Sequence, residues 1–277
     1  MIDMKKRVLA LFTCFNRREK TERCVNSLRN SNFDIDIDFL VCDDNSTDGT
    51  TEALKKYERV KILGGTGSLF YTGGMRMIIA EAQQNYRDYD YYLLMNDDVL
   101  FDTHAIDDIV RQAENKNNAV IVGCTYGRNH ELTYGGIIFD NPSKKVRYTK
   151  FGPGNDALRC DTFHANCVLI PRKVFFDAEN MDEVYNHSLG DLDYGLKISR
   201  MGYDILVSEK YIGSCIIDSP QNTWVDKQLS RIERIRKKES KKGVPTNEWF
   251  HFVRKNFGLK MAIIYSITPY IKILFRK

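Results

Sequence analysis

Short apolar runs alternate with segments of helical spacing along the first half of the chain. A short, continuous apolar run is typical of a strand that is buried on both faces. Strands are therefore predicted at residues 7–12, 37–42, 60–63, 91–95 and 119–124, and helices at residues 19–29, 50–57, 75–85 and 104–114. Repeated strand–helix units of this length predict a mainly parallel sheet that is covered by helices.

The second half of the chain has a different pattern. Alternating runs with glycines and an Asn141-Pro142 turn predict a hairpin over residues 132–150. A strand is expected at 160–170, a helix at 191–201 and a further strand at 203–207. The pattern of the C-terminal residues predicts a basic helix at 227–242, a short helix at 247–256 and a largely apolar segment at 258–275. We therefore expect an α/β domain over residues 1–222 and a basic, amphipathic helical extension over residues 223–277.

Positive charge is concentrated in that extension. Residues 227–277 carry 14 Lys and Arg against three Asp and Glu, a net charge of +11, whereas the whole chain carries only +4. Such a segment is either a solvated helix face or a surface that attracts anions. Apolar and aromatic residues among the basic ones favour an anionic membrane surface, with the helices lying in the interface. The apolar helix could instead serve a homodimer, and nucleic acid is not expected because no motif that reads it is present.

Composition excludes several classes of protein. The chain has 277 residues, of which 43% are hydrophobic and 28% charged, and this balance is typical of a globular protein. No uncharged apolar run is long enough for a simple transmembrane helix, and the first residues do not resemble a signal peptide. The seven cysteines include no CxxC pair, so neither a disulfide framework nor a zinc knuckle is expected. Free thiols favour a reducing, cytoplasmic compartment.

Polar loops follow the first four predicted strands. They span residues 13–17, 43–50, 64–74 and 96–98. Each alone could be an ordinary turn or a helix cap. Because ligands bind beyond the carboxyl ends of parallel strands, four such loops together predict one ligand cleft.

Two groups of acidic residues are candidates for chemistry. Asp97 and Asp98 are adjacent carboxylates, which repel unless a cation or hydrogen bonds compensate them, and oxygen ligands suit magnesium or manganese. Asp191 lies at the start of a predicted helix, where it could cap the helix or act as a general base. Residues 65–70 lack the third glycine of a dinucleotide-binding loop, and no P-loop or GxSxG motif occurs.

The four polar loops and the segment around Asp191, in the order in which they follow one another over residues 6–220, resemble the motifs of the inverting nucleotide-sugar glycosyltransferases of family 2. The resemblance implies the GT-A fold, an α/β, Rossmann-like, mixed and mainly parallel sheet flanked by helices, here with a helical C-terminal extension. It implies a divalent metal, manganese or magnesium, at Asp98, and Asp191 as the catalytic base. The residues that match the family's nucleotide-binding motifs are Thr13, Phe15, Asn16, Arg17, Asp44, Ser46, Gly67, Gly73, Gly74, Met75, Asn96 and Asp97. Of these, Asp44 matches the aspartate that contacts the base of the nucleotide.

Two positions depart from the family pattern. Gly190 stands where the family usually has a Glu before the base, and Cys215 stands near the place of a late metal-binding His. We expect the sugar or acceptor pocket to be shaped by Tyr71, His164, Asn166, Asp193 and Trp224.

The tail, residues 222–224 and 243–245, resembles the extension of members that build bacterial surface polysaccharides, rhamnosyltransferase-like members among them. The resemblance implies a UDP- or dTDP-linked donor and a glycan or lipid-linked acceptor. With the basic tail, it also implies a cytoplasmic enzyme that is peripheral on the inner face of the cell membrane.

Two other functions remain open from the sequence. A nucleotidyltransferase also uses a metal and a Rossmann-like sheet, but it usually carries a glycine-rich basic loop after its first strand, and residues 13–18 contain no glycine. A membrane-docked scaffold with a degenerate site is the non-enzymatic alternative. The intact Asp97, Asp98 and Asp191 argue against it.

Overall fold

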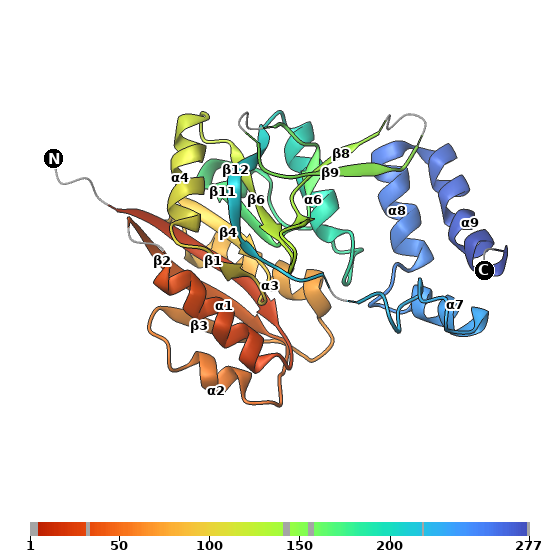
Figure 1. Cartoon of the computed structure of the whole chain (residues 1–277), viewed down its shortest axis with the longest axis horizontal. Helices are drawn as coiled ribbons and strands as arrows, with labels where there is room; N and C mark the ends of the chain where they lie inside the picture. The colour runs from red at the N-terminus through yellow and green to blue at the C-terminus, as the bar shows by residue number, and fades with distance from the viewer. Residues whose placement is uncertain (1–4, 32–33, 141–144, 155–157, 218, 276–277) are drawn as a thin grey trace.

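The computed structural model describes residues 5–31, 34–140, 145–154, 158–217 and 219–275. Its main sheet has nine strands, with β3, β2, β1, β4, β11, β6, β12 and β5 in spatial order and β7 paired to β6 (Figure 1). A second sheet of three strands has the order β10, β8, β9.

Four parallel strands form the first half of the main sheet. They are β1 (Lys6–Cys14), β2 (Ile35–Asp43), β3 (Val60–Gly64) and β4 (Tyr91–Met95). Val8 through Phe12 are completely buried, because helices cover both faces of this strand. Burial on both faces explains why the strands are continuous apolar runs rather than alternating ones. The paired ends of β1 and β2 place Cys14 beside Asp43 at one edge.

The other half of the sheet makes it mixed. β11 (Cys167–Pro171) runs antiparallel between β4 and β6 (Val120–Tyr126), and β12 (Ile205–Ser214) runs parallel to β6. The short strands of the two sheets are β5 (Leu100–Phe101), β7 (Leu132–Tyr134), β8 (Gly136–Phe139), β9 (Tyr148–Phe151) and β10 (Thr162–Phe163). The expected mixed, mainly parallel sheet is confirmed, and the hairpin is β8–β9. The Asn141-Pro142 turn lies outside the described residues.

Helices close both faces of the main sheet. α1 (Arg18–Asn30), α2 (Thr50–Leu54) and α4 (Ala105–Asn115) share one hydrophobic cluster with the strands. α3 (Phe70–Asn85), α5 (Arg172–Asp177) and α6 (Gly190–Arg200) share the other. All seven cysteines are free and buried, as expected for small apolar side chains in these clusters.

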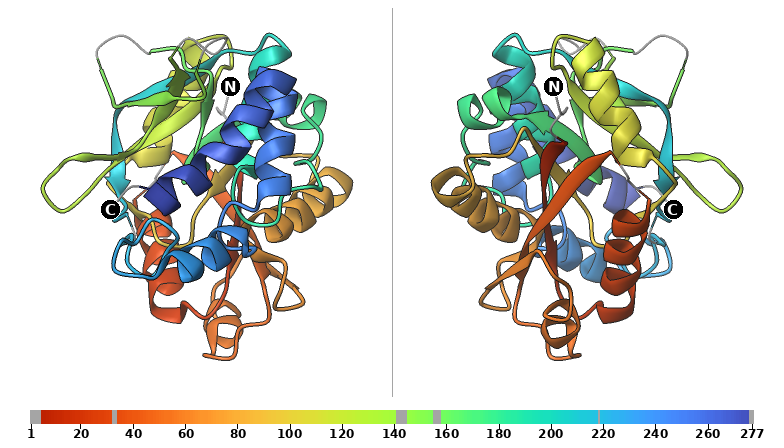
Figure 2. Two further views of the ribbon diagram at one scale, coloured as in Figure 1. Left: turned by 90° about the vertical axis from the view of Figure 1, so that its right-hand side faces the viewer. Right: turned by 90° about the vertical axis from the view of Figure 1, so that its left-hand side faces the viewer.

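The C-terminal helices pack against the domain. They are α7 (Arg231–Glu239), α8 (Thr246–Phe257) and α9 (Leu259–Phe275) (Figure 2). Phe252 and Val253 of α8 share a third cluster with Phe139 of β8 and Leu192 of α6. Among the residues that the structure describes, no helix has the length and apolar content needed to cross a bilayer.

Several elements differ from the sequence prediction. α3 begins at Phe70 instead of residue 75, and the strand expected at 160–170 is divided into β10 and β11. The break at residues 164–166 turns the backbone toward α6, where Ala165 N–H is bonded to Asp191. β5 and α5 were not predicted, because both are too short to show a hydrophobic period.

Candidate active site

The loops after β1 and β2 are tied to each other at the edge of the sheet. Asn16 N–H donates to Ser46 Oγ at 2.9 Å, and Thr47 N–H donates to Asn16 Oδ1 at 2.7 Å. Asn16 adopts a left-handed φ of 51°, which Asn tolerates better than most residues. Phe15 stands beside this junction with 43% of its surface exposed. The two loops therefore form one rigid wall, with an exposed aromatic ring at its tip.

Asp44 holds the glycine loop. Its Oδ1 accepts from Gly67 N–H at 2.7 Å, and its Oδ2 accepts from Leu69 and Phe70 N–H at 2.9 and 3.1 Å. These bonds satisfy amides at the start of α3, which explains why that helix begins inside the loop. The sequence predicted Asp44 as a contact of the base. In the structure its carboxylate is 4% exposed and bonded to the loop amides.

Arg17 compensates the adjacent carboxylates that follow β4. Its guanidinium donates to Asp97 Oδ1 at 2.9 Å and to Asp98 Oδ2 at 2.8 Å. Burial raises the pKa of Asp97 to about 6 although Arg17 opposes the rise, and Asp98 adds to it. The Asp98 side chain is 16% exposed against 4% for Asp97. Asp98 is thus the more accessible carboxylate of the pair.

Cys215 reaches the acidic pair from the end of β12. Its Sγ donates to Asp98 Oδ1 at 3.6 Å, and Asn166 Nδ2 donates to that sulfur, also at 3.6 Å. Burial, together with Asp98, raises the pKa of the Cys215 thiol to about 12, so the thiol stays protonated when no cation is bound beside it. Within the described residues no three His, Cys, Asp or Glu side chains are grouped as a metal site. Magnesium often needs only one or two carboxylates plus substrate phosphates, and Asp98 fits that role.

Asp191 lies in the first turn of α6, on the other side of the cleft. Its Oδ2 accepts from Ala165 N–H at 3.1 Å and lies 3.5 Å from His164 Nδ1, while Oδ1 accepts from Leu192 N–H at 2.8 Å. Burial raises the pKa of Asp191, but His164 and the two amides lower it by more than burial raises it. The resulting pKa lies below the usual value of an aspartate. The carboxylate is therefore ionised near neutral pH, as a proton acceptor must be.

Aromatic side chains surround this carboxylate. His164 lies between Tyr134 and Tyr148, with ring centroids 6.1 and 6.3 Å away. The Tyr71 hydroxyl is buried and has no hydrogen-bond partner in the described residues. Burial, with Asp191 adding to it, raises the pKa of Tyr71 and of Tyr148. The orphaned Tyr71 hydroxyl, whose pKa responds to the Asp191 charge, is a place where a bound hydroxylated ligand would complete the hydrogen bonding.

Gly190 departs from the family pattern for a steric reason. A Cβ at this position would lie 2.3 Å from Cγ2 of Thr72 on α3. Thr72 is itself fixed, because its hydroxyl donates to the carbonyl of His187 at 3.0 Å. The close approach of α3 to α6 thus excludes a side chain before Asp191.

Several predicted site residues are packed against other parts of the chain. Met75 is completely buried in the core, and a Cβ on Gly74 would lie 2.4 Å from Thr13 Oγ1, so both serve helix packing. Asp193 accepts from Lys255 Nζ at 2.7 Å and from Asn256 Nδ2 at 2.9 Å, and therefore faces α8. Trp224 is half-buried in the segment before α7.

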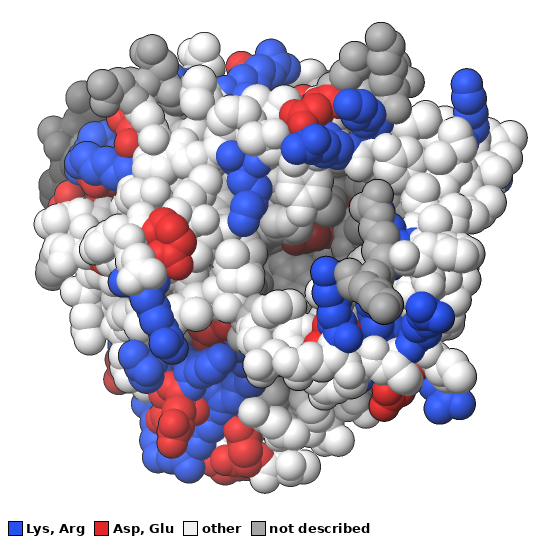
Figure 3. All heavy atoms as spheres, turned by 45° about the vertical axis from the view of Figure 1, so that its right-hand side comes forward, with Lys and Arg blue, Asp and Glu red and all other residues white. Residues whose placement is uncertain are grey.

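The remaining members of the predicted set are close to the cleft-forming loops. Asn96 N–H donates to the Asn166 carbonyl at 3.1 Å, and a Cβ on Gly73 would lie 3.3 Å from Leu69. Figure 3 shows a face of the molecule that is hollowed near its centre, with an acidic side chain in the hollow and Lys and Arg side chains along its edge. The sequence does not predict Tyr148 as a site residue, because no pattern along the chain shows that the β8–β9 hairpin lies near His164 and Asp191.

Comparisons with known proteins agree with this geometry. The sequence model of "Glycosyl transferase family 2" matches residues 10–175. No curated protein sequence matches the chain.

Three solved structures share the fold over 98% of the chain. Residues 1–349 of S. aureus TarS align at 18% identity with a TM-score of 0.57, covering 81% of that chain. TarS in complex with UDP-GlcNAc aligns at 16% identity with a TM-score of 0.59, covering 82%. A mannosyltransferase from Pyrobaculum calidifontis, in complex with GDP-Man and Mn²⁺, aligns at 14% identity with a TM-score of 0.59, covering 75%.

The hydrogen bonding around Asp191 yields a titration test. Replacing His164 by Asn removes the imidazole that lowers the pKa of Asp191, so the carboxyl should titrate at higher pH. The change is measured from the Asp191 carboxyl carbon shift in NMR spectra recorded against pH. His104→Asn is the matched control, because His104 pairs with Asp107 at the start of α4. An unchanged titration in His164→Asn would show that His164 does not act on this carboxylate.

Proposed function

The chain belongs to glycosyl transferase family 2, and from that premise we propose that it transfers a sugar from a nucleoside diphosphate to an acceptor hydroxyl, with inversion. Asp191 is the observation that carries the proposal. It is an ionised carboxylate fixed by two amides and His164, beside the unpartnered Tyr71 hydroxyl. A base held in this way suits removal of a proton from an attacking hydroxyl.

The proposed reaction is a single displacement. Asp191 takes the proton of the acceptor hydroxyl while the acceptor oxygen bonds to the anomeric carbon. The bond from that carbon to the phosphate oxygen breaks on the opposite face, and its electron pair leaves with the nucleoside diphosphate. Attack opposite the leaving group inverts the anomeric configuration. Tyr71, His164 and Tyr148 would orient the acceptor or the donor sugar, since all three surround Asp191.

A divalent metal is part of the proposal. Asp98 would hold Mn²⁺ or Mg²⁺ together with the donor diphosphate, and the ion would neutralise the charge of the leaving group. The mannosyltransferase of similar fold was solved with GDP-Man and Mn²⁺. Arg17 would stay with the buried Asp97 and leave Asp98 to the ion.

The donor and acceptor are proposed by class. UDP- or dTDP-linked hexoses are the proposed donors, and TarS, one protein of similar fold, was solved with UDP-GlcNAc. The proposed acceptor is a growing glycan or a lipid-linked precursor of a surface polysaccharide. A nucleotidyltransferase would instead release pyrophosphate, so the released product, nucleoside diphosphate or pyrophosphate, separates these two enzymes.

Asp191→Asn tests the base. The amide has the same shape but cannot accept a proton, so the variant should bind donor like the wild type and lose about 100-fold or more in turnover. Turnover is measured as release of nucleoside diphosphate, and donor binding by calorimetry. Asp204→Asn is the control, because Asp204 is an exposed acid paired with Arg159 on the surface. Full turnover by Asp191→Asn would remove this residue from the mechanism.

Asp98→Ala tests the metal. Removing the accessible carboxylate should weaken donor binding in Mn²⁺ or Mg²⁺ by about tenfold or more, because the ion keeps only the phosphate ligands. In chelator the variant and the wild type should bind donor alike. Equal affinities in the presence of metal would contradict the assignment of Asp98.

The extension is the proposed membrane contact. The apolar residues of α9 that are at least 41% exposed lie one, three or four positions apart, at Leu259, Ile263, Ile264, Ile267, Ile271, Leu274 and Phe275. Lysines interrupt this apolar surface, and the segment's net charge of +11 complements anionic headgroups. We propose that α9 lies in the cytoplasmic surface of the membrane and brings the cleft to a lipid-linked acceptor.

Vesicle sedimentation tests this contact. The full chain should bind vesicles that contain phosphatidylglycerol, and less well those of phosphatidylcholine alone. Ile263→Glu with Ile267→Glu should reduce binding by about tenfold or more, because two charges enter the apolar surface. Ile216→Glu, an exposed apolar position outside the extension, is the control. Concentration-dependent dimers without vesicle binding would assign the same surface to a second copy.

A further inference from the structure

The segment between α5 and α6 is bound on one side by α3. Arg76 Nη1 donates to the carbonyl of Tyr185 at 2.6 Å and to that of Asp182 at 3.2 Å. Asn180 Nδ2 donates in return to the carbonyl of Arg76 at 2.9 Å. Three bonds therefore fix this segment on the helix that follows the glycine loop.

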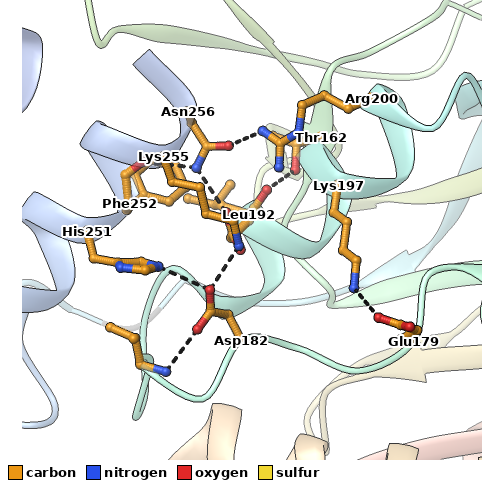
Figure 4. A network of polar contacts seen from close by, with 12 residues as sticks. Thr162, Glu179, Asp182, Leu192, Lys197, Arg200, His251, Phe252, Lys255 and Asn256 are labelled. Atoms are coloured by element: carbon orange, nitrogen blue, oxygen red, sulfur yellow. Dashed lines mark hydrogen bonds and ion pairs between the residues drawn. The ribbon is translucent and has the colours of Figure 1, made fainter. Parts of the chain in front are cut away.

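The same segment is bound on its other side by α8 of the extension. Glu248 is 1% exposed, and its two carboxylate oxygens accept from Asn186 Nδ2 at 2.6 Å and from Asn186 N–H at 3.3 Å. A buried carboxylate is costly without such donors, so this contact requires Asn186 in one position. His251 and Lys255 of α8 add bonds to Asp182 at 3.1 and 2.9 Å (Figure 4).

Asn186 passes this constraint to the catalytic cleft. Its carbonyl accepts from Thr72 N–H at 3.1 Å and from Gly73 N–H at 3.3 Å, in the first turn of α3. The next carbonyl, of His187, accepts the Thr72 hydroxyl. Four residues further along the chain is Asp191. Asn186 thus connects three parts of the molecule: α8 of the extension, the start of α3, which carries Tyr71, and the backbone that leads to Asp191.

We propose that Glu248 is a positioning residue for the transfer reaction, and that α8 is required to hold the active site in its catalytic geometry. Glu248 fixes Asn186, and Asn186 fixes the first turn of α3 relative to the backbone that leads to Asp191. Reacting groups held in this way lose rate steeply when they shift by about 1 Å. The inference rests on the proposed function, because it assigns Glu248 to the same cleft.

A second polar network, around the exposed Glu239 of the extension, gives a control. Glu239 at the end of α7 accepts from Lys238 Nζ at 2.6 Å and from Thr246 N–H at 3.0 Å. These bonds hold α7 to α8, and no described bond of Glu239 reaches the segment between α5 and α6. A variant of Glu239 therefore weakens the extension without disturbing Asn186.

The test is a swap of the hydrogen-bonding pair. Glu248→Gln keeps one acceptor oxygen for the two Asn186 donors and points an amide donor at the other, so kcat should fall about tenfold or more at saturating donor while KM changes less. Glu248→Gln combined with Asn186→Asp restores an amide–carboxylate pair in which position 248 donates and position 186 accepts. This double variant should recover most of kcat. Glu239→Gln should keep kcat even where it lowers Tm. A kcat of Glu248→Gln within twofold of wild type, or a double variant worse than both single ones, would overturn the proposal.

A second measurement requires no donor. Hydrogen exchange of the Thr72 and Gly73 amides should be faster in Glu248→Gln than in the wild type, and unchanged in Glu239→Gln, because Asn186 accepts from both amides. Wild-type protein that transfers no sugar would contradict the proposed function alone. Unchanged exchange in Glu248→Gln would contradict the role of Glu248 alone.

Discussion

A carboxylate taken out of water costs several kcal/mol of free energy unless donors surround it, and the cleft is built around carboxylates that meet this constraint. Asp44 is compensated by amides of the glycine loop, Asp97 by Arg17, and Asp191 by amides and His164. In each case at least one donor comes from a distant part of the chain. The bonds that make burial possible therefore also assemble the loops into one site.

The same constraint separates the roles of the acids. Burial raises the pKa of Asp97, whereas donors hold the pKa of Asp191 low, so Asp191 is the acid that suits the proposed role of proton acceptor. Asp98 is the acid left facing the cleft, and Cys215 beside it is a neutral thiol. The two departures from the family pattern fit this arrangement, because Thr72 leaves no room for a side chain at Gly190.

Much of the fold could be predicted because local patterns determine it. The parallel strands are apolar throughout since both faces are covered, and the polar loops follow at their carboxyl ends. What the sequence did not show depends on contacts between distant residues. The start of α3 at Phe70 depends on Asp44, and the break near Ala165 depends on Asp191. The contact of Tyr148 with His164 and that of Glu248 with Asn186 likewise depend on the packing of a hairpin and of α8.

The central claim is that this cleft binds a nucleoside diphosphate with the help of a metal. Calorimetric titration of the full chain with UDP, dTDP, GDP and CDP, each in Mn²⁺, Mg²⁺ or chelator, tests it most directly. The account predicts that one of these nucleotides binds, and binds more tightly with metal than with chelator. Absence of binding by all four in every condition would contradict it, and would leave the chain with the fold of the family but without its donor site.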